Sequence, residues 1–333
     1  MKRVTIKDIA KSLGVAYSTV SMAMSGDKTI SEKMKKKVRK KAAEMGYYPN
    51  RSARNLVKGY TNNIAVVTPG LFSLYEMNII RGMEKQMVNS RYDLILHTSR
   101  YDWQEVHNEM RKVMYEQTAD AVIIIGVVIK DELINEFKKA KTPLINVDGG
   151  LLNATCDLNI DNVYCGKIAA EHFIKIGRKK PALILGNTKF AYSQAARLRG
   201  YRDTLKKHGI KLSDSFIYES PLYLPDDLRQ IGFKTAEILI DRGADAIYCS
   251  SGDYVAQGVL RYCSYRGIKV PEEVSIIGTD NFDVAEALNL STIEQPLMEM
   301  GQRAFEVAEK AVRDKKFYGK SEFFKPRLII RNT

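Results

Sequence analysis

Residues 5–26 read TIKDIAKSLGVAYSTVSMAMSG, a pattern that predicts a helix, a tight turn and a second helix. Thr5 and Asp8 stand three residues apart, which is the spacing of a capping box at the start of a helix. Gly14 ends this first helix, because glycine readily adopts the left-handed conformation that closes a helix. The side that faces a core is marked by apolar residues at helical spacing, namely Ile6, Ile9, Ala10 and Leu13.

The second helix has an unusual outer surface. Val15 and Val20 supply its apolar anchors. The side chains that remain free to project outward are those of Tyr17, Ser18, Ser21 and Met22. A recognition helix meets the major groove of DNA in this way. The alternative is an ordinary helical hairpin in a core, but so short a hairpin has too little apolar surface to need Tyr, Ser and Met exposed together.

The distribution of charge favours the DNA-binding interpretation. Residues 1–60 hold 15 Lys and Arg against 4 Asp and Glu, which leaves 37 against 35 for residues 61–333 out of the totals of 52 and 39. Nearly all of the net charge of +13 therefore lies in the first sixth of the chain. A phosphate backbone binds such clustered charge through the release of its counterions.

The basic segment continues through a third helix, expected from Ser31 to Met45 and closed by Gly46. Its Lys-rich face is often only a solvated surface, but beside a recognition helix proximity to phosphate is the better interpretation. Residues 47–59, YYPNRSARNLVKG, predict at most two helical turns, too few to be stable in isolation. Two alternatives remain for this segment: a hinge helix that folds when DNA or a partner copy receives Leu56, or a linker.

From Ile64 the pattern changes to alternating strands and helices, which is typical of parallel sheets buried on both faces. Two similar sets of such units predict two lobes, with a ligand cleft at the carboxyl ends of their strands. The expected strands include residues 64–67, 94–96, 121–126, 143–148, 182–186, 216–218, 246–249 and 274–278, and the expected helices lie near 77–90, 104–117, 131–140, 162–176, 192–208, 228–241 and 253–266.

Catalytic motifs are missing from the sequence. No glycine-rich dinucleotide or phosphate loop, nucleophile elbow or metal-ligand spacing is present, so we expect no enzyme, no cofactor and no metal site. The four cysteines form no paired motif and lie in or beside apolar runs, typical of free thiols in a reducing cytosol. With no signal peptide and no apolar run long enough to span a membrane, the expected location is the cytoplasm.

The sequence resembles the lactose/galactose repressor family of bacterial transcription regulators. The resemblance rests on residues 4–10 (VTIKDIA), 15–21 (VAYSTVS), 46–50 (GYYPN), 276–281 (IIGTDN), 291–296 (STIEQP) and 326–331 (PRLIIR). It implies an α/β protein with an N-terminal three-helix helix-turn-helix head, a hinge helix, and a two-lobed core similar to periplasmic binding proteins, made of two parallel sheets. The implied domains are a head at 1–48, hinge helix and linker at 49–61, an N-lobe at 62–160 with 293–320, and a C-lobe at 161–292 with 321–333.

The resemblance also assigns DNA-binding residues. Tyr17, Ser18 and Met22 match positions that read base edges, and the positions that contact phosphate are Thr5, Ser21, Ser31, Tyr47 and Asn50. Leu56 matches the hinge leucine that wedges into the minor groove and bends the DNA. Met22 departs from the usual arginine, and it offers only apolar contact, for instance to a thymine methyl group.

The same resemblance implies an effector site, formed by Tyr75, Asp148, Ser193, Arg197, Asp253, Asp280 and Gln295. Carboxylates and a guanidinium suit a ligand with vicinal hydroxyls. The alternative for each residue is a structural salt bridge between the lobes. We expect Arg197, Asp148 and Asp280 to form one polar clamp, because an unpaired buried charge costs several kcal/mol.

These observations predict a homodimeric repressor that binds a palindromic double-stranded DNA operator and answers to a sugar-like effector in the cleft. The direction of the response, induction or corepression, is left open. One alternative is a regulator of the same family controlled mainly by a protein partner, a phosphocarrier protein. Another is a sugar-binding protein without a regulatory role, which the basic head opposes.

Overall fold

The structure, a computed structural model, describes residues 4–48, 60–70, 73–99, 103–189, 191–220, 228–314 and 316–333. The chain divides into two compact units, Met1–Thr61 and Asn62–Thr333. We call them the head and the core and describe each by itself. The predicted hinge helix, with Asn50 and Leu56, lies outside the described residues.

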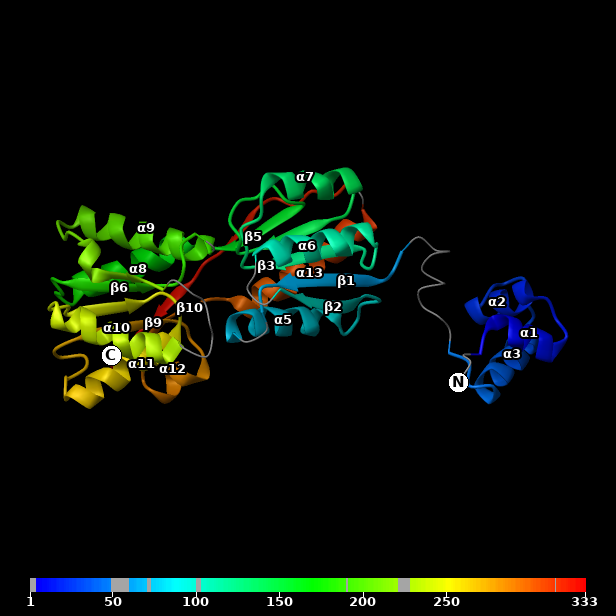
Figure 1. Cartoon of the computed structure of the whole chain (residues 1–333), viewed down its shortest axis with the longest axis horizontal. Coiled ribbons are helices and arrows are strands. Elements are labelled where there is room, and N and C mark those ends of the chain that lie inside the picture. The colour runs from blue at the N-terminus through cyan, green and yellow to red at the C-terminus, as the bar shows by residue number, and fades with distance from the viewer. Residues whose placement is uncertain are drawn as a thin grey trace. The chain divides into compact units, whose positions relative to one another are not determined.

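The head consists of α1 (Ile6–Leu13), α2 (Tyr17–Ser25) and α3 (Glu32–Glu44) (Figure 1). The predicted capping box is confirmed: the Thr5 side chain accepts from the Asp8 amide, and the Asp8 carboxylate accepts from the Thr5 amide at 2.8 Å. Gly14 closes α1 with φ of 66°. The three helices pack around a small core of Ile9, Ala10, Val20, Ala23, Val38 and Ala42.

The first sheet of the core has the strand order β11-β5-β4-β3-β1-β2, and its described pairs are all parallel. Its strands are β1 (Asn63–Thr68), β2 (Asp93–Thr98), β3 (Ala121–Ile125), β4 (Leu144–Val147), β5 (Cys156–Ile160) and β11 (Glu322–Phe324). Alternate residues of β1 pack into different hydrophobic clusters. Ile64 and Val66 belong to one cluster, and Ala65 and Val67 belong to the other. This alternation follows from the period of two along a strand, and it predicts a helix layer on each face.

The helices of this first lobe are α5 (Leu74–Met87), α6 (Trp103–Tyr115), α7 (Asp131–Ala140) and α13 (Leu297–Arg313). One face of the sheet is covered by α5 together with α13, and the other by α6 and α7. Figure 1 shows α13, coloured orange, beside this sheet although it comes late in the sequence.

The second sheet has the order β12-β10-β9-β8-β6-β7. Its strands are β6 (Pro181–Leu185), β7 (Ile217–Glu219), β8 (Ala246–Cys249), β9 (Ser275–Asp280), β10 (Ser291–Glu294) and β12 (Arg327–Ile329), the last antiparallel to β10. One face is covered by α8 (Asn162–Lys175) and α9 (Tyr192–Lys207), and the other by α10 (Leu228–Asp241) and α11 (Asp253–Arg266). A short 3₁₀ helix (Asp214–Phe216) precedes β7, and α12 (Asp283–Ala287) follows β9.

Two of the predicted lobe boundaries are wrong by a few residues. Strand β10 runs to Glu294 within the second sheet, so the chain returns to the first lobe after residue 294 rather than 292. Strand β11 pairs with β5, so residues 322–324 belong to the first sheet and not to the second lobe. Only hydrogen bonding to β5 distinguishes β11 from the nearby β12, and a sequence pattern of so few residues carries no such information.

The helix pairs of the core approach closely at glycines. A Cβ at Gly200 of α9 would overlap the Val163 carbonyl oxygen, and a Cβ at Gly166 of α8 would overlap the Arg197 carbonyl oxygen. Reciprocal pairs of the same kind join α5 to α13, through Gly82 and Gly301. The close contact of α8 with α9 at Gly166 and Gly200 fixes the position of α9, from which Arg197 projects.

Candidate functional site

The exposed surface of α2 carries the predicted base-reading residues. Tyr17 is 64% exposed, Ser18 and Ser21 are exposed, and Met22 is half-buried. The nine residues of the helix contain no charge. Their outward direction follows from burial of Val20 and Ala23 on the opposite side. The helix thus presents an uncharged, mixed polar and apolar face, the kind of surface that contacts base edges.

Two of the five residues predicted to contact phosphate lie at helix starts. Thr5 and Ser31 cap α1 and α3, where the Ser31 hydroxyl accepts from the Met34 amide at 3.3 Å. The N-terminus of a helix carries partial positive charge and favours anions. Tyr47 is half-buried and packs against the core of the head. Each of these contacts with phosphate stays a prediction.

Basic side chains lie along the exposed surface of α3. Lys33, Lys36, Lys37 and Lys40 are all exposed. Lys35 differs, because it is buried and forms an ion pair with Glu32 at 2.8 Å. Most of the Lys-rich run is therefore available to a polyanion, while one lysine serves the structure of the head.

In the core, Asp148 lies at the carboxyl end of β4 with φ of 57° and is 2% exposed. One carboxylate oxygen accepts from the Tyr75 hydroxyl at 2.8 Å. The other accepts from the Ile160 amide at 3.1 Å and from Asn162 Nδ2 at 2.8 Å. Burial raises the pKa of Asp148, and the nearby Arg197 and these donors oppose that rise.

Arg197 joins this cluster to the second lobe without a direct bond to a carboxylate. Its Nε donates to Asn162 Oδ1 at 2.8 Å, and its two terminal nitrogens donate to the Ser250 carbonyl at 2.6 Å and to Gln295 Oε1 at 2.8 Å. Gln295 in turn donates to Asp280. The structure therefore brings five of the seven predicted effector residues into one hydrogen-bonded chain, together with Asn162, which was not predicted. We call this chain the inter-lobe network, and its members are Tyr75, Asp148, Asn162, Arg197, Gln295 and Asp280.

The predicted clamp is corrected in one respect. Within the described residues, Arg197 reaches Asp148 through Asn162 and reaches Asp280 through Gln295, so the three charges form a relay and not direct ion pairs. The reason is geometric, since the fork of the guanidinium is filled by two amide oxygens and one carbonyl oxygen.

Asp280 occupies a place in the second sheet equivalent to that of Asp148 in the first, because β9 and β4 are both third in their sheets. Asp280 also has a positive φ, 102°. For residues other than glycine such a conformation costs about 1–3 kcal/mol and persists where the surroundings impose it. Burial raises the pKa of Asp280 to about 6, against the lowering effect of Arg197. A Cβ at Gly252 would lie 3.3 Å from Asp280 Oδ2, so any larger residue at position 252 would crowd the carboxylate.

The two remaining predicted effector residues stand apart from this network. Asp253 is fully buried, and its oxygens accept from the Phe282 amide at 2.9 Å and the Thr292 hydroxyl at 2.6 Å. Burial and, secondarily, Asp280 raise its pKa to about 8. These bonds tie α11 to β10 within the second lobe, a structural arrangement. Ser193 is half-buried on α9, one turn before Arg197.

Sequence reasoning missed several residues of this region. Asn162 belongs to no recognisable sequence motif, yet its side chain connects Asp148 of the first lobe to Arg197 of the second. Ser250 contributes only a backbone carbonyl, which no side-chain pattern reveals. Glu76 is 6% exposed at the start of α5, directly after Tyr75. No functional motif in the sequence marks this residue, and the structure buries it.

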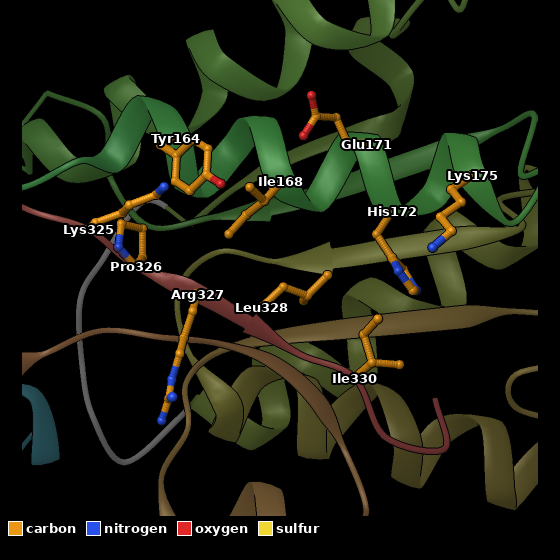
Figure 2. Close-up of a pocket in the computed structure, with 10 residues that line it drawn as sticks. All are labelled: Tyr164, Ile168, Glu171, His172, Lys175, Lys325, Pro326, Arg327, Leu328 and Ile330. Atoms are coloured by element: carbon orange, nitrogen blue, oxygen red, sulfur yellow. The ribbon is translucent and has the colours of Figure 1, made fainter.

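A surface groove lies elsewhere in the second lobe, between α8 and the segment that contains β12 (Figure 2). None of the seven predicted effector residues lines it. The residues around it are Tyr164, Ile168, Glu171, His172, Lys175, Lys325, Pro326, Arg327, Leu328 and Ile330.

The described part of the chain offers little support for metal, disulfide or membrane chemistry. The four cysteines are free and buried, as predicted. Among the residues that the structure describes, no group of three or more His, Cys, Asp or Glu is placed to hold a metal ion. None of the described helices is both long and apolar enough to cross a membrane.

Comparison with known proteins gives two family matches. Residues 5–50 match the profile of bacterial regulatory proteins of the lacI family, and residues 170–333 match the periplasmic binding protein-like domain. The chain is 28% identical over 338 residues to the HTH-type transcriptional regulator DegA of Bacillus subtilis (strain 168), covering 99% of this chain and 98% of the relative. It is also 28% identical over 339 residues to the HTH-type transcriptional repressor PurR of Vibrio vulnificus (strain CMCP6), with the same coverage.

The fold is found among solved structures as well. The Lac repressor dimer bound to operator and the anti-inducer ONPF has a TM-score of 0.84 at 20% identity, covering 100% of this chain and 99% of that one. The order of the head and core, the two sheets and the family matches agree with one another. The chain therefore combines a helix-turn-helix head of the bacterial lacI regulatory family with a periplasmic-binding-protein-like core.

Proposed function

We propose that this protein is a sequence-specific DNA-binding transcriptional repressor that binds a palindromic operator as a homodimer. The observation that carries the proposal is the exposed, uncharged face of α2 on a strongly basic head. Base contacts would come from Tyr17, Ser18 and Met22, and phosphate contacts from Thr5, Ser21 and the basic face of α3. The relatives DegA and PurR, which are transcription regulators, support this role.

We further propose that the inter-lobe network is the effector site. The network links side chains from both lobes through a continuous set of hydrogen bonds. A polar ligand that exchanged these bonds for its own would bind the two lobe arrangements with different affinity and so shift their populations. The protein acts in this scheme by binding and not by catalysis, in the cytoplasm where its operator lies.

Selection from a random double-stranded DNA library tests the first proposal. The enriched sequence should be palindromic, and log affinity for it should fall with log salt with a slope of several units. Tyr17→Ala should weaken binding to the selected sequence by about 1–3 kcal/mol while leaving random DNA nearly unaffected. Tyr318→Ala is the matched control, because that tyrosine is 65% exposed on the core.

Two results would overturn the proposal. One is affinity that does not change with salt. The other is a wild-type protein that binds the enriched and the random sequences equally well.

A further inference from the structure

Glu76 is an unexplained buried acid beside the inter-lobe network. It lies in the first turn of α5, next to Tyr75, and is 6% exposed. Its Oε2 atom is buried and has no hydrogen-bond partner among the described residues. Burial and then the nearby Asp280 charge raise the pKa of Glu76 to about 8. The first turn of α5 follows the carboxyl end of β1, and the neighbouring Tyr75 donates to Asp148, so Glu76 lies at the edge of the first sheet where the lobes meet.

A capping role does not account for this side chain. The sequence Ser73-Leu74-Tyr75-Glu76 has the spacing of a capping box. In the structure Ser73 makes no side-chain capping bond, and its own hydroxyl is buried and without a partner. An unsatisfied buried acceptor costs about 1–3 kcal/mol, and more for a charged group. Two such atoms therefore stand at one end of α5 with nothing in the described protein to bond.

The acids of this region differ in how far the protein satisfies them. Asp148 has three donors and Asp253 has two. Glu76 lacks a partner on Oε2, and for Asp280 the described side-chain donor is Gln295. Arg197 offers no compensation to Glu76, because its guanidinium already donates to Asn162, Ser250 and Gln295. The region thus has four carboxyl groups and one buried cation, with spare acceptor capacity on acids from both lobes.

We propose that the effector carries a protonated amine in addition to hydroxyl groups, and that this amine sits between Glu76 of the first lobe and Asp280 of the second. The inference rests on the proposed effector site. An ammonium group donates three hydrogen bonds and supplies the positive charge that hydroxyl groups lack. An amino sugar has this combination, with hydroxyls left over for the rest of the network. A metal ion is a poorer fit, because the described acids are not placed as a metal-binding group.

Paired ligands test the proposal. Glucosamine, galactosamine and mannosamine are each titrated against the full-length protein alongside glucose, galactose and mannose. At least one amine should bind about 10- to 100-fold more tightly than its neutral parent, the range expected for a charge-assisted hydrogen bond. Glu76→Gln should abolish that preference, because glutamine keeps the size of the side chain but not its charge. Glu84→Gln, an exposed position on the same helix, should leave it intact.

The readouts separate this inference from the proposed function. Operator binding by the same preparations is measured in parallel, and thermal unfolding checks that each variant is folded. A panel in which no amine binds more tightly than its parent refutes the amine inference, as does a preference that survives Glu76→Gln. Loss of operator binding by the wild-type protein would instead refute the proposed function. Should Glu76→Gln fail to fold, Asp280→Asn serves as the second variant, with the same loss of preference expected.

Discussion

Replacing Asn162 by alanine should destabilise the core strongly, because among the described residues it is Asn162 that connects Asp148 to Arg197. Its amide nitrogen donates to Asp148 at 2.8 Å, its oxygen accepts from Arg197 at 2.8 Å, and it is 2% exposed. A hydrogen bond to a charged group contributes about 1.5–3 kcal/mol, so losing two removes about 3–6 kcal/mol from the free energy of unfolding. In a domain of this size, that corresponds to a fall in Tm of about 6 °C or more.

Calorimetry and urea unfolding of the wild type and Asn162→Ala measure this effect. Asn108→Ala is the matched control, since Asn108 is exposed on α6, and its change should stay within about 0.5 kcal/mol. A loss for Asn162→Ala no larger than that of the control would refute the reasoning, because it would show that the relay contributes no stability.

Three further predictions concern other parts of the chain. Stability of the core should fall as pH rises from 5 to 9. The folded state holds protons on Glu76 and Asp253, whose pKa values of about 8 lie above the ordinary 4.5 and 3.8, and the unfolded state has already released them. Glu76→Gln should reduce that fall by about 3–5 kcal/mol in urea unfolding, and an unchanged pH profile would contradict the assignment. Gly200→Ala should lower the free energy of unfolding by about 1–3 kcal/mol in calorimetry, because the added methyl group overlaps the Val163 carbonyl, and an unchanged Tm would show that the helices separate freely. Thr5→Ala should cost the head about 1 kcal/mol by removing the capping box, seen as faster amide hydrogen exchange in α1, and equal exchange rates would argue against a stabilising cap.

The helices and buried strands were largely predictable because their signals are local. The helices at 131–140, 228–241 and 253–266 have the bounds expected from apolar periodicity. The capping box at Thr5 depends only on residues three apart, and so it could be read directly. Strands β10, β11 and β12 were less accessible, because they are only three or four residues long and depend on partners far along the chain.

The sequence by itself determined the head, the basic charge, the repeated strand-helix units and the acids and arginine that gather where the lobes meet. Only the tertiary structure decided how those charges are connected. Asn162 lies between Asp148 and Arg197 because β5 leads directly into α8 as the chain passes from one lobe to the other. Likewise, only the tertiary structure buries Glu76 and leaves its Oε2 atom without a hydrogen-bond partner among the described residues. Hydrogen bonding and desolvation depend on such distances, which a linear pattern does not contain.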